Sequence, residues 1–187
     1  MQFGIKSVSM DDIASNVGVS KKTIYKHFVD KKALINDVMD HALSFDQTNC
    51  EKCTKGDGNA IQIMINLSKM VSESHKDMNP VVMYDVRKYY PITYLKIESF
   101  RNGFIKQNLK QNILQGQEEG LYSESIDPEI VSLYYITLIE GMMKQLSSKD
   151  NSYDFKTLHF HMVSYHLRGI CTLNGLEYLE NHINEIQ

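Results

Sequence analysis

Residues 17–28 read VGVSKKTIYKHF, and their apolar residues recur at helical spacing beside a face that carries three lysines. Gly18 is expected to end one short helix. Ser20 is expected to cap the next, because a serine hydroxyl accepts a hydrogen bond from a free amide of the first helical turn. Ile24 and Phe28, four residues apart, then lie on the buried side of the second helix. The stretch therefore predicts two short helices joined by a tight glycine turn, the helix-turn-helix arrangement.

The flanking residues extend this arrangement on both sides. Ser9, followed three residues later by Asp12, is typical of a capping box at the start of the first helix. Ile13 and Val17 supply the apolar stripe of that helix. Asp30 is expected to cap a third, longer helix. Together these signals predict a small N-terminal helical domain.

The rest of the chain shows helical periodicity and no sustained alternation of strand type. Helices are expected near residues 59–75, 80–89, 92–118, 128–147, 154–173 and 176–186. The predicted fold class is all-α, with a helix-turn-helix domain at residues 1–45 and an all-helical domain at residues 46–187. We call these two parts the reading head and the body.

The formal net charge of −3 is unevenly distributed. Residues 1–32 hold six lysines against three aspartates, a balance of +3, so the remainder sums to −6. A basic end on an acidic body is expected when one segment meets phosphate. The chain has no apolar run of about 18 residues and no signal-peptide layout, and its three cysteines suit a reducing compartment. We therefore expect a cytoplasmic protein without a membrane partner.

The stretch VSMDDIASNVGVSKKTIYKHFVDKKALI, residues 8–35, resembles the DNA-binding domain of the tetracycline-repressor (TetR) family. The residues that carry the resemblance are Gly4, Ser9, Ile13, Ala14, Val17, Gly18, Val19, Ser20, Thr23, Ile24, Tyr25, His27, Phe28, Lys31 and Leu34. The resemblance implies a small reading head on a larger C-terminal body that dimerises and usually holds an effector pocket. Double-stranded DNA, a second copy of the chain and an unknown small-molecule effector are the implied partners.

The second short helix would enter the major groove of DNA. The predicted DNA-binding residues are Ser9, Ser20, Lys21, Lys22, Thr23, Tyr25, Lys26, His27 and Lys31. By resemblance, Lys21, Lys22 and Thr23 lie nearest the bases, and Tyr25 and His27 bind the DNA backbone. Ser9 and Lys31 contact flanking phosphates. The alternative is a solvated lysine face on an ordinary small helix.

Members of the TetR family carry a further helix before the position of Gly4, whereas this sequence opens with MQFG. Without it, the apolar sides of Ile13, Val17 and Ile24 lose a cover of several hundred Å², worth several kcal/mol at about 25 cal/mol per Å². We therefore expect that the first helix is missing or shortened in this sequence and that the native protein begins earlier.

The segment 128–147 is apolar on nearly all sides and must be covered on two faces. The resemblance implies that this segment and 154–173 pair with their mates in a four-helix dimer interface. The predicted interface residues are Leu138, Met142, Phe155, Met162, His166 and Ile170. Burial within one subunit is the alternative. A two-fold dimer presents its heads to half-sites about 34 Å apart or slightly more, which predicts a palindromic operator.

Tyrosine, phenylalanine and methionine are frequent in the middle of the chain. The predicted ligand-pocket residues are Met83, Tyr84, Tyr94, Phe100, Phe104 and Tyr134. The ligand itself would be apolar or aromatic. The alternative is that these side chains are ordinary core.

Other constellations are weak. Cys50 and Cys53 form one C-x-x-C pair without the second pair that a zinc site requires. His159 and His161 diverge around a helix, and His166 shares a face only with the first of them, which favours packing. No catalytic residue, metal site or cofactor is expected, and no catalytic motif indicates an enzyme.

The sequence favours a ligand-responsive DNA-binding transcriptional regulator, a repressor that binds a palindromic operator as a homodimer. The alternative is a helical dimeric interaction module that has lost DNA binding.

Overall fold

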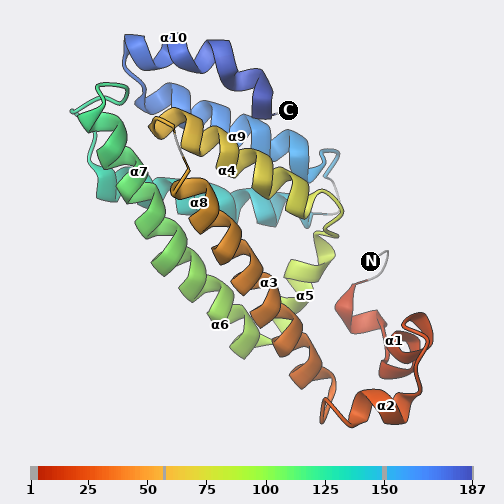
Figure 1. Ribbon diagram of the computed structural model, residues 1–187. Coiled ribbons are helices and arrows are strands. Elements are labelled where there is room, and N and C mark those ends of the chain that lie inside the picture. The colour runs from red at the N-terminus through yellow and green to blue at the C-terminus, as the bar shows by residue number, and fades with distance from the viewer. Residues whose placement is uncertain (1–3, 57, 149–150, 187) are drawn as a thin grey trace.

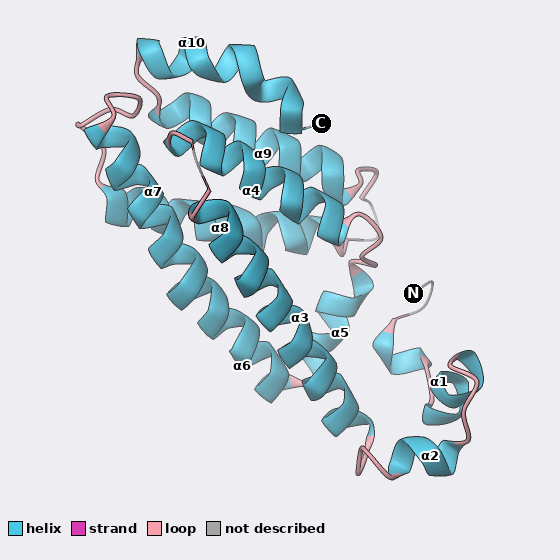
Figure 2. Cartoon of the chain, viewed as in Figure 1, coloured by secondary structure: helices cyan, strands magenta, loops and turns pink. Residues whose placement is uncertain are grey.

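The computed structural model describes residues 4–56, 58–148 and 151–186 (Figure 1). Its helical elements, in chain order, are η1 (Ile5–Ser7), α1 (Met10–Asn16), α2 (Lys21–Tyr25), α3 (Lys31–Thr54), α4 (Ala60–His75), α5 (Val81–Tyr89), α6 (Pro91–Phe100), the π-helical turn η2 (Arg101–Ile105), α7 (Lys106–Glu118), α8 (Pro128–Leu146), α9 (Phe155–Ile170), α10 (Leu173–His182) and η3 (Ile183–Ile186). No strand occurs in these ranges apart from one isolated bridge, between Tyr122 and Cys171 (Figure 2). The all-α prediction is confirmed.

The four local signals of the helix-turn-helix are all present. Ser9 and Asp12 form a complete capping box at the start of α1. Gly18 has a φ of 70°, a left-handed conformation that glycine adopts without steric cost. The side chains of Ser20 and Asp30 accept hydrogen bonds from the backbone amides of Thr23 and Ala33, at the first turns of α2 and α3.

The body helices depart from the predicted ranges in three places. One is the helix expected at 176–186, which is α10 (Leu173–His182) followed by the 3-10 turn η3. The expected helix 92–118 consists of α6 and α7 joined by the π-helical turn η2. The expected helix 154–173 ends at Ile170, because Cys171 is extended and forms the bridge to Tyr122. Thr172 then caps α10.

The main core lies in the body, between α4, α7, α8, α9 and α10. Its centre is formed by large apolar side chains with no exposed surface, among them Ile61, Ile113, Leu167 and Leu179. None of the helices in the described ranges is both long enough and apolar enough to span a bilayer.

Two smaller cores hold the reading head. Met10, Ala14 and Ile24 form one between α1, α2 and the first turns of α3. Ile5 from η1 belongs to the other, which it shares with Ile35 of α3 and with residues of α5 and α6. The head is therefore attached to the body through η1 as well as through α3.

The predicted domain boundary between residues 45 and 46 falls inside α3, which is one continuous helix. Figure 1 shows α1 and α2 at one end of the molecule, beyond the first turns of α3, while the rest of α3 runs into the body. The division into two domains stays a prediction.

Candidate nucleic-acid interface and cavity

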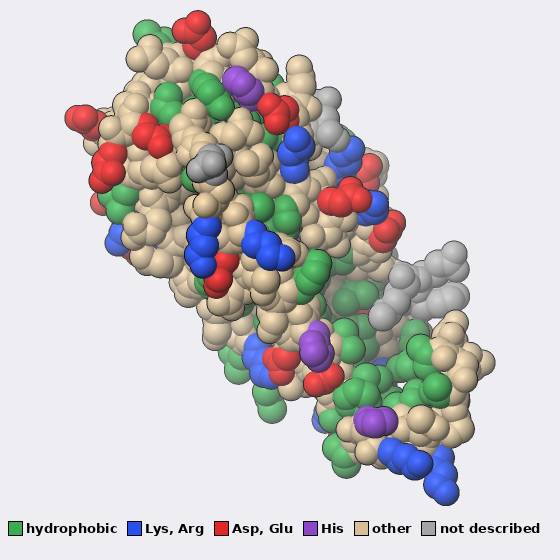
Figure 3. Space-filling view, viewed as in Figure 1, with side chains coloured by type: hydrophobic (Ala, Val, Ile, Leu, Met, Phe, Trp, Pro, Cys, Tyr) green, Lys and Arg blue, Asp and Glu red, His purple; other side chains and the backbone are tan. Residues whose placement is uncertain are grey.

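The outer side of α2 and the turn after it carry most of the predicted DNA-binding residues. Ile24 is 8% exposed and packs with Phe28 against α1. The side chains on the opposite side are exposed, namely Lys22, Thr23, Tyr25, Lys26 and His27. Figure 3 shows lysine and histidine side chains at this tip of the molecule. The two apolar anchors therefore fix a basic, hydroxyl-bearing surface outward.

The two serines of the predicted set are helix caps. The Ser9 hydroxyl lies 2.7 Å from the Asp12 carboxylate, and it also accepts from the Asp12 amide at 3.1 Å. This hydrogen bonding lowers the pKa of Asp12. The Ser20 hydroxyl lies 2.8 Å from that of Thr23. Both serines are exposed, so their hydroxyls cap the helices and remain accessible to a DNA phosphate.

Lys21 forms an ion pair with Asp11 of α1, with 2.7 Å between the ammonium and the carboxylate. The hydrogen bond to Asp11 raises the pKa of the Lys21 ammonium. Both side chains are more than half exposed, and exposed pairs of this kind contribute little to stability. No ion pair of Lys22 or Lys26 occurs within the described residues.

Lys31, at the start of α3, has partners within the chain. Its ammonium donates to the backbone carbonyls of Ile5 and Val8, and its side chain is half-buried. These carbonyls belong to the short turn η1 and the residue after it, and the Ile5 carbonyl also accepts from the Val8 amide. In the chain without DNA, Lys31 therefore ties η1 to α3, and its contact with a flanking phosphate stays a prediction.

A second contact ties η1 to α5 of the body. The buried Asp85 carboxylate accepts from the Lys6 backbone amide at 2.9 Å, and the Lys6 ammonium lies 3.2 Å from the Tyr89 hydroxyl. A Cβ at Gly4 would stand 2.6 Å from the Asp85 carboxylate and 2.9 Å from Val81. We call Gly4, Lys6, Asp85 and Tyr89 the η1–α5 clamp. Sequence reasoning missed this clamp, and the glycine is its only local signal.

A cavity of about 930 Å³ runs along α3. Its wall is mainly apolar and includes Ile5, Val8 and Leu34 from the reading head and Met142 and Met162 from the body. Head and body therefore share one cavity.

Two of the six predicted pocket residues line the cavity, and four do not. Met83 and Phe100 line the cavity. Tyr84 and Tyr134 are instead exposed on the surface, and Tyr94 and Phe104 lie outside the cavity wall. Tyr135, the neighbour of Tyr134, faces inward, because successive helical residues point about 100° apart.

The cavity wall contains a column of stacked rings that the sequence did not reveal. The ring centroids of His75 and Phe155 lie 5.4 Å apart, and those of Phe155 and His159 lie 5.3 Å apart. His75 is 3.8 Å from the Asp46 carboxylate, and the Nδ1 atom of His159 is 3.5 Å from the Ser68 hydroxyl. Burial lowers the pKa of His159 to about 4, so its imidazole is neutral at pH 7. Burial raises the pKa of Asp46, while His75 opposes that shift.

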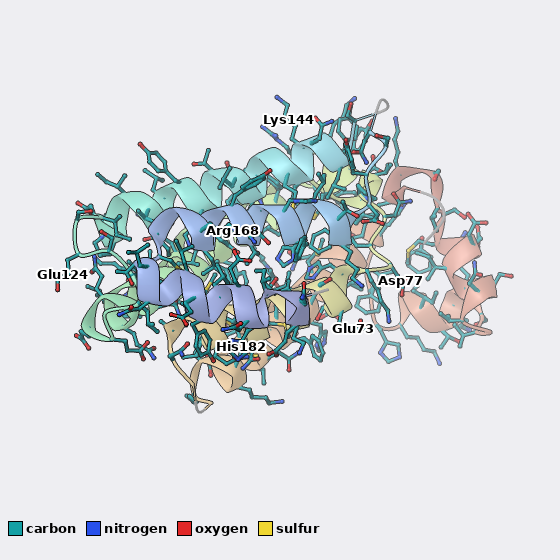
Figure 4. All side chains as sticks on the ribbon, turned by 90° about the horizontal axis from the view of Figure 1, so that it is seen from above. Glu73, Asp77, Glu124, Lys144, Arg168 and His182 are labelled. Carbon is teal, nitrogen blue, oxygen red and sulfur yellow. The ribbon has the colours of Figure 1, made fainter. Side chains whose placement is uncertain are left out.

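The predicted dimer-interface residues differ in how far they are exposed on the subunit. Phe155, Met162 and Ile170 are buried inside the subunit, and His166 packs edge-on to Tyr135 at 4.6 Å between ring centroids. Leu138 is exposed, and Met142 is half-buried. The exposed apolar side chains of α8 and α9 lie elsewhere on these helices, at Ile130, Leu133, Tyr134 and Tyr165. Figure 4 shows Lys144 projecting from the outer side of α8.

The cysteines and remaining histidines form no clustered site. Cys50, Cys53 and Cys171 are free thiols. Burial raises the pKa of Cys50 to about 11, which disfavours the reactive thiolate. Within the ranges that the structure covers, no group of three or more histidine, cysteine, aspartate or glutamate side chains is placed to hold a metal ion.

Comparison with known proteins agrees with this geometry. Residues 1–38 match the family model described as bacterial regulatory proteins, tetR family. Among curated proteins, none matches the chain by sequence.

Solved structures resemble the chain over most of its length. A transcriptional regulator from Cytophaga hutchinsonii superposes with a TM-score of 0.72 and 20% identity, covering 91% of each chain. The fatty acid degradation regulator FadR from Bacillus halodurans superposes with a TM-score of 0.72 and 18% identity, covering 90% of this chain and 88% of its own. Reduced NemR from E. coli superposes with a TM-score of 0.71 and 17% identity, covering 91% of this chain and 90% of its own. At these identities the likeness shows the fold.

Proposed function

We propose that this chain, which belongs to the TetR family of bacterial regulatory proteins, is a cytoplasmic repressor that binds a palindromic operator as a homodimer. A small molecule in the cavity along α3 would release the DNA. The observation that carries the proposal is the outward basic side of α2, which Ile24 and Phe28 anchor to the reading head.

The chemistry of this surface suits a DNA duplex. Lys22 and Lys26 can neutralise phosphates or donate to guanine edges, and the hydroxyls of Thr23 and Tyr25 can bond phosphate oxygens. His27 lies exposed in the turn that follows α2. Lys21 joins them when phosphate displaces Asp11 from an ion pair that is already solvated.

Dimer formation would cover the exposed apolar stripe of α8 and α9. Tyr134 is 64% exposed and Tyr165 is 72% exposed. A Cβ at Gly141 or Gly169 would meet no atom within 4 Å, so a partner helix can approach closely at both positions. We therefore centre the proposed interface on Leu138, Tyr134 and Tyr165. Three predicted interface residues are left out because they are buried in the subunit, namely Phe155, Met162 and Ile170.

The shared cavity supplies a route from ligand to DNA. A ligand changes the position of the head only if it binds one arrangement of head and body more tightly than the other. Val82 and Met83 of α5 line the cavity, while Asp85 of the same helix holds η1. A ligand that displaces α5 therefore acts directly on the η1–α5 clamp.

A dimeric interaction module without DNA binding is the second candidate. It is favoured by the internal partners of Lys21 and Lys31, which leave fewer free ammonium groups than the sequence predicts.

Fluorescence anisotropy of the full-length protein with duplexes from the region beside its gene separates the two candidates. We expect selective, salt-sensitive binding, and a loss of about 1–3 kcal/mol in binding free energy for Lys22→Ala. Lys52→Ala is the matched control, because Lys52 is exposed at the far end of α3. Equal, weak binding to every duplex would favour the module.

A further inference from the structure

Methionine is concentrated around the cavity. The chain has ten methionines, and eight of them line this one wall. They come from α3, α4, α5, α8, α9 and the loop before α5. Of the other two, Met1 lies outside the described residues and Met10 is in the small core of the reading head.

A wall of thioethers behaves differently from a wall of branched side chains. Methionine is unbranched, has three rotatable side-chain bonds and carries a polarisable sulfur, so it fills irregular gaps and contacts aromatic rings favourably. Flexible methionine-rich surfaces repack around different partners. The cavity can therefore change its shape at low cost.

The column of His75, Phe155 and His159 is the less adaptable part of the wall. Its three stacked rings come from α4 and α9, which lie against each other in the main core. At one end of the column, the neutral imidazole of His159 and the hydroxyl of Ser68 are buried polar groups. They offer one place for a hydrogen-bonding group of a ligand.

The cavity penalises charge. Burial raises the pKa of Asp46 and of Cys50 and lowers that of His159, so each of these groups is shifted toward its neutral form. A charged ligand would lose its hydration in the same surroundings. Three further lysine, arginine and aspartate side chains line the wall. The ammonium of half-buried Lys31 is held by the backbone carbonyls of Ile5 and Val8, whereas Arg101 is half-buried and Asp77 is exposed.

We propose that the cavity binds uncharged, largely apolar ligands of more than one shape, each with one hydrogen-bonding group placed against His159 and Ser68. This inference rests on the proposed function, because it names the chemical class of the effector. It replaces a single cognate ligand with a set of neutral molecules that the methionines accommodate.

Titration of the full-length protein with four dyes tests the ligand class. N-phenyl-1-naphthylamine and Nile red are neutral and differ in shape, 1-anilinonaphthalene-8-sulfonate is an anion, and rhodamine 6G is a cation. We expect both neutral dyes to bind saturably and to displace each other. The two charged dyes should bind at least about tenfold more weakly, because their charge must be desolvated.

Substitution of methionines tests the shape tolerance. In a Met83→Leu, Met142→Leu double variant, the ratio of the two neutral dyes' dissociation constants should change by about threefold or more, since branched leucine adapts less well. Met10→Leu is the matched control, and it should leave the ratio unchanged. Thermal unfolding of each variant shows whether the fold is retained; hydrophobic exchanges of similar volume usually preserve it.

Three results would overturn the inference: no saturable binding of a neutral dye, charged dyes that bind as tightly as neutral ones, or an unchanged ratio in the folded double variant. DNA titration keeps this outcome separate from the proposed function. Selective DNA binding without neutral-dye binding rejects the ligand class alone. Dye binding without selective DNA binding rejects the repressor and leaves the ligand class in place.

Discussion

The body and the reading head differ in how their helices are held together. Among the described residues, sixteen buried side chains form the main core of the body, whereas three form the core between α1, α2 and α3. The head also leaves Val17 62% and Val29 81% exposed. Packing therefore dominates the stability of the body, while helix caps and contacts through η1 carry a larger share in the head. The two parts of the chain therefore depend on different kinds of contact.

A pair of truncations should separate the two parts most strongly. Leu167→Ala removes a fully buried side chain from the main core, and we expect a loss of about 2–5 kcal/mol in the free energy of unfolding. Met10→Ala should speed amide hydrogen exchange in α1 and α2 while the main unfolding transition stays nearly unchanged. Denaturation followed by circular dichroism, together with exchange mass spectrometry, measures both. Equal losses in the main transition would mean that head and body unfold as one unit.

Acid should weaken the body through His159. Its pKa is lowered from 6.5 to about 4 in the folded state, so below pH 6.5 the unfolded chain binds a proton that the folded chain does not. Stability is therefore lost as the pH falls from 6.5 toward 4, with a slope of up to about 1.4 kcal/mol per pH unit. In His159→Gln this contribution to the slope should disappear. An unchanged pH dependence in that variant would show that His159 does not titrate in this way.

Loss of the η1–α5 clamp should loosen the head without unfolding the body. Asp85→Ala removes the acceptor of the Lys6 amide, at a local cost of about 1–3 kcal/mol. We expect faster exchange of the amides of residues 5–8. Asp85→Asn keeps a carbonyl acceptor and should lie between Asp85→Ala and the parent chain. If exchange in this segment is the same in all three proteins, the clamp does not hold the head.

Gly18→Ala should produce the smallest change in stability, confined to the turn between α1 and α2. Its φ of 70° costs an alanine about 1–2 kcal/mol. A Cβ at this position would meet no atom within 4 Å, so the cost is conformational and does not arise from steric crowding. We expect weaker DNA binding in anisotropy titrations with little change in the main thermal transition. Full DNA affinity in this variant would show that the turn need not be left-handed.

The predictability of each feature follows from how far apart its determinants lie in the chain. The caps at Ser9, Ser20 and Asp30 each depend on an amide three residues away, so the sequence predicts them directly. The partners of Lys31 lie 23 and 26 residues away, and the contact of Lys6 with Asp85 spans 79 residues. No local pattern encodes the partners of Lys31, and Gly4 is the only local signal of the contact between Lys6 and Asp85.

The buried side of a helix was also hard to predict where the helix is apolar on all sides. In α8, Tyr134 and Tyr135 are adjacent and chemically identical, yet only Tyr135 is buried. In α9, Phe155 and Met162 are as apolar as any interface residue, and only their neighbours in space show that they belong to the subunit's own core. The helix could be predicted, but its inner side could not.

Selection of binding sites from a random duplex library by the full-length protein tests the central claim most directly. We predict enrichment of an inverted repeat whose half-sites lie about one helical turn apart or slightly more, about 34 Å along the duplex. A Lys22→Ala, Tyr25→Ala double variant that retains its thermal transition should lose this enrichment. Failure to enrich any sequence, or equal enrichment by the double variant, would contradict the assignment of α2 as the DNA-reading helix.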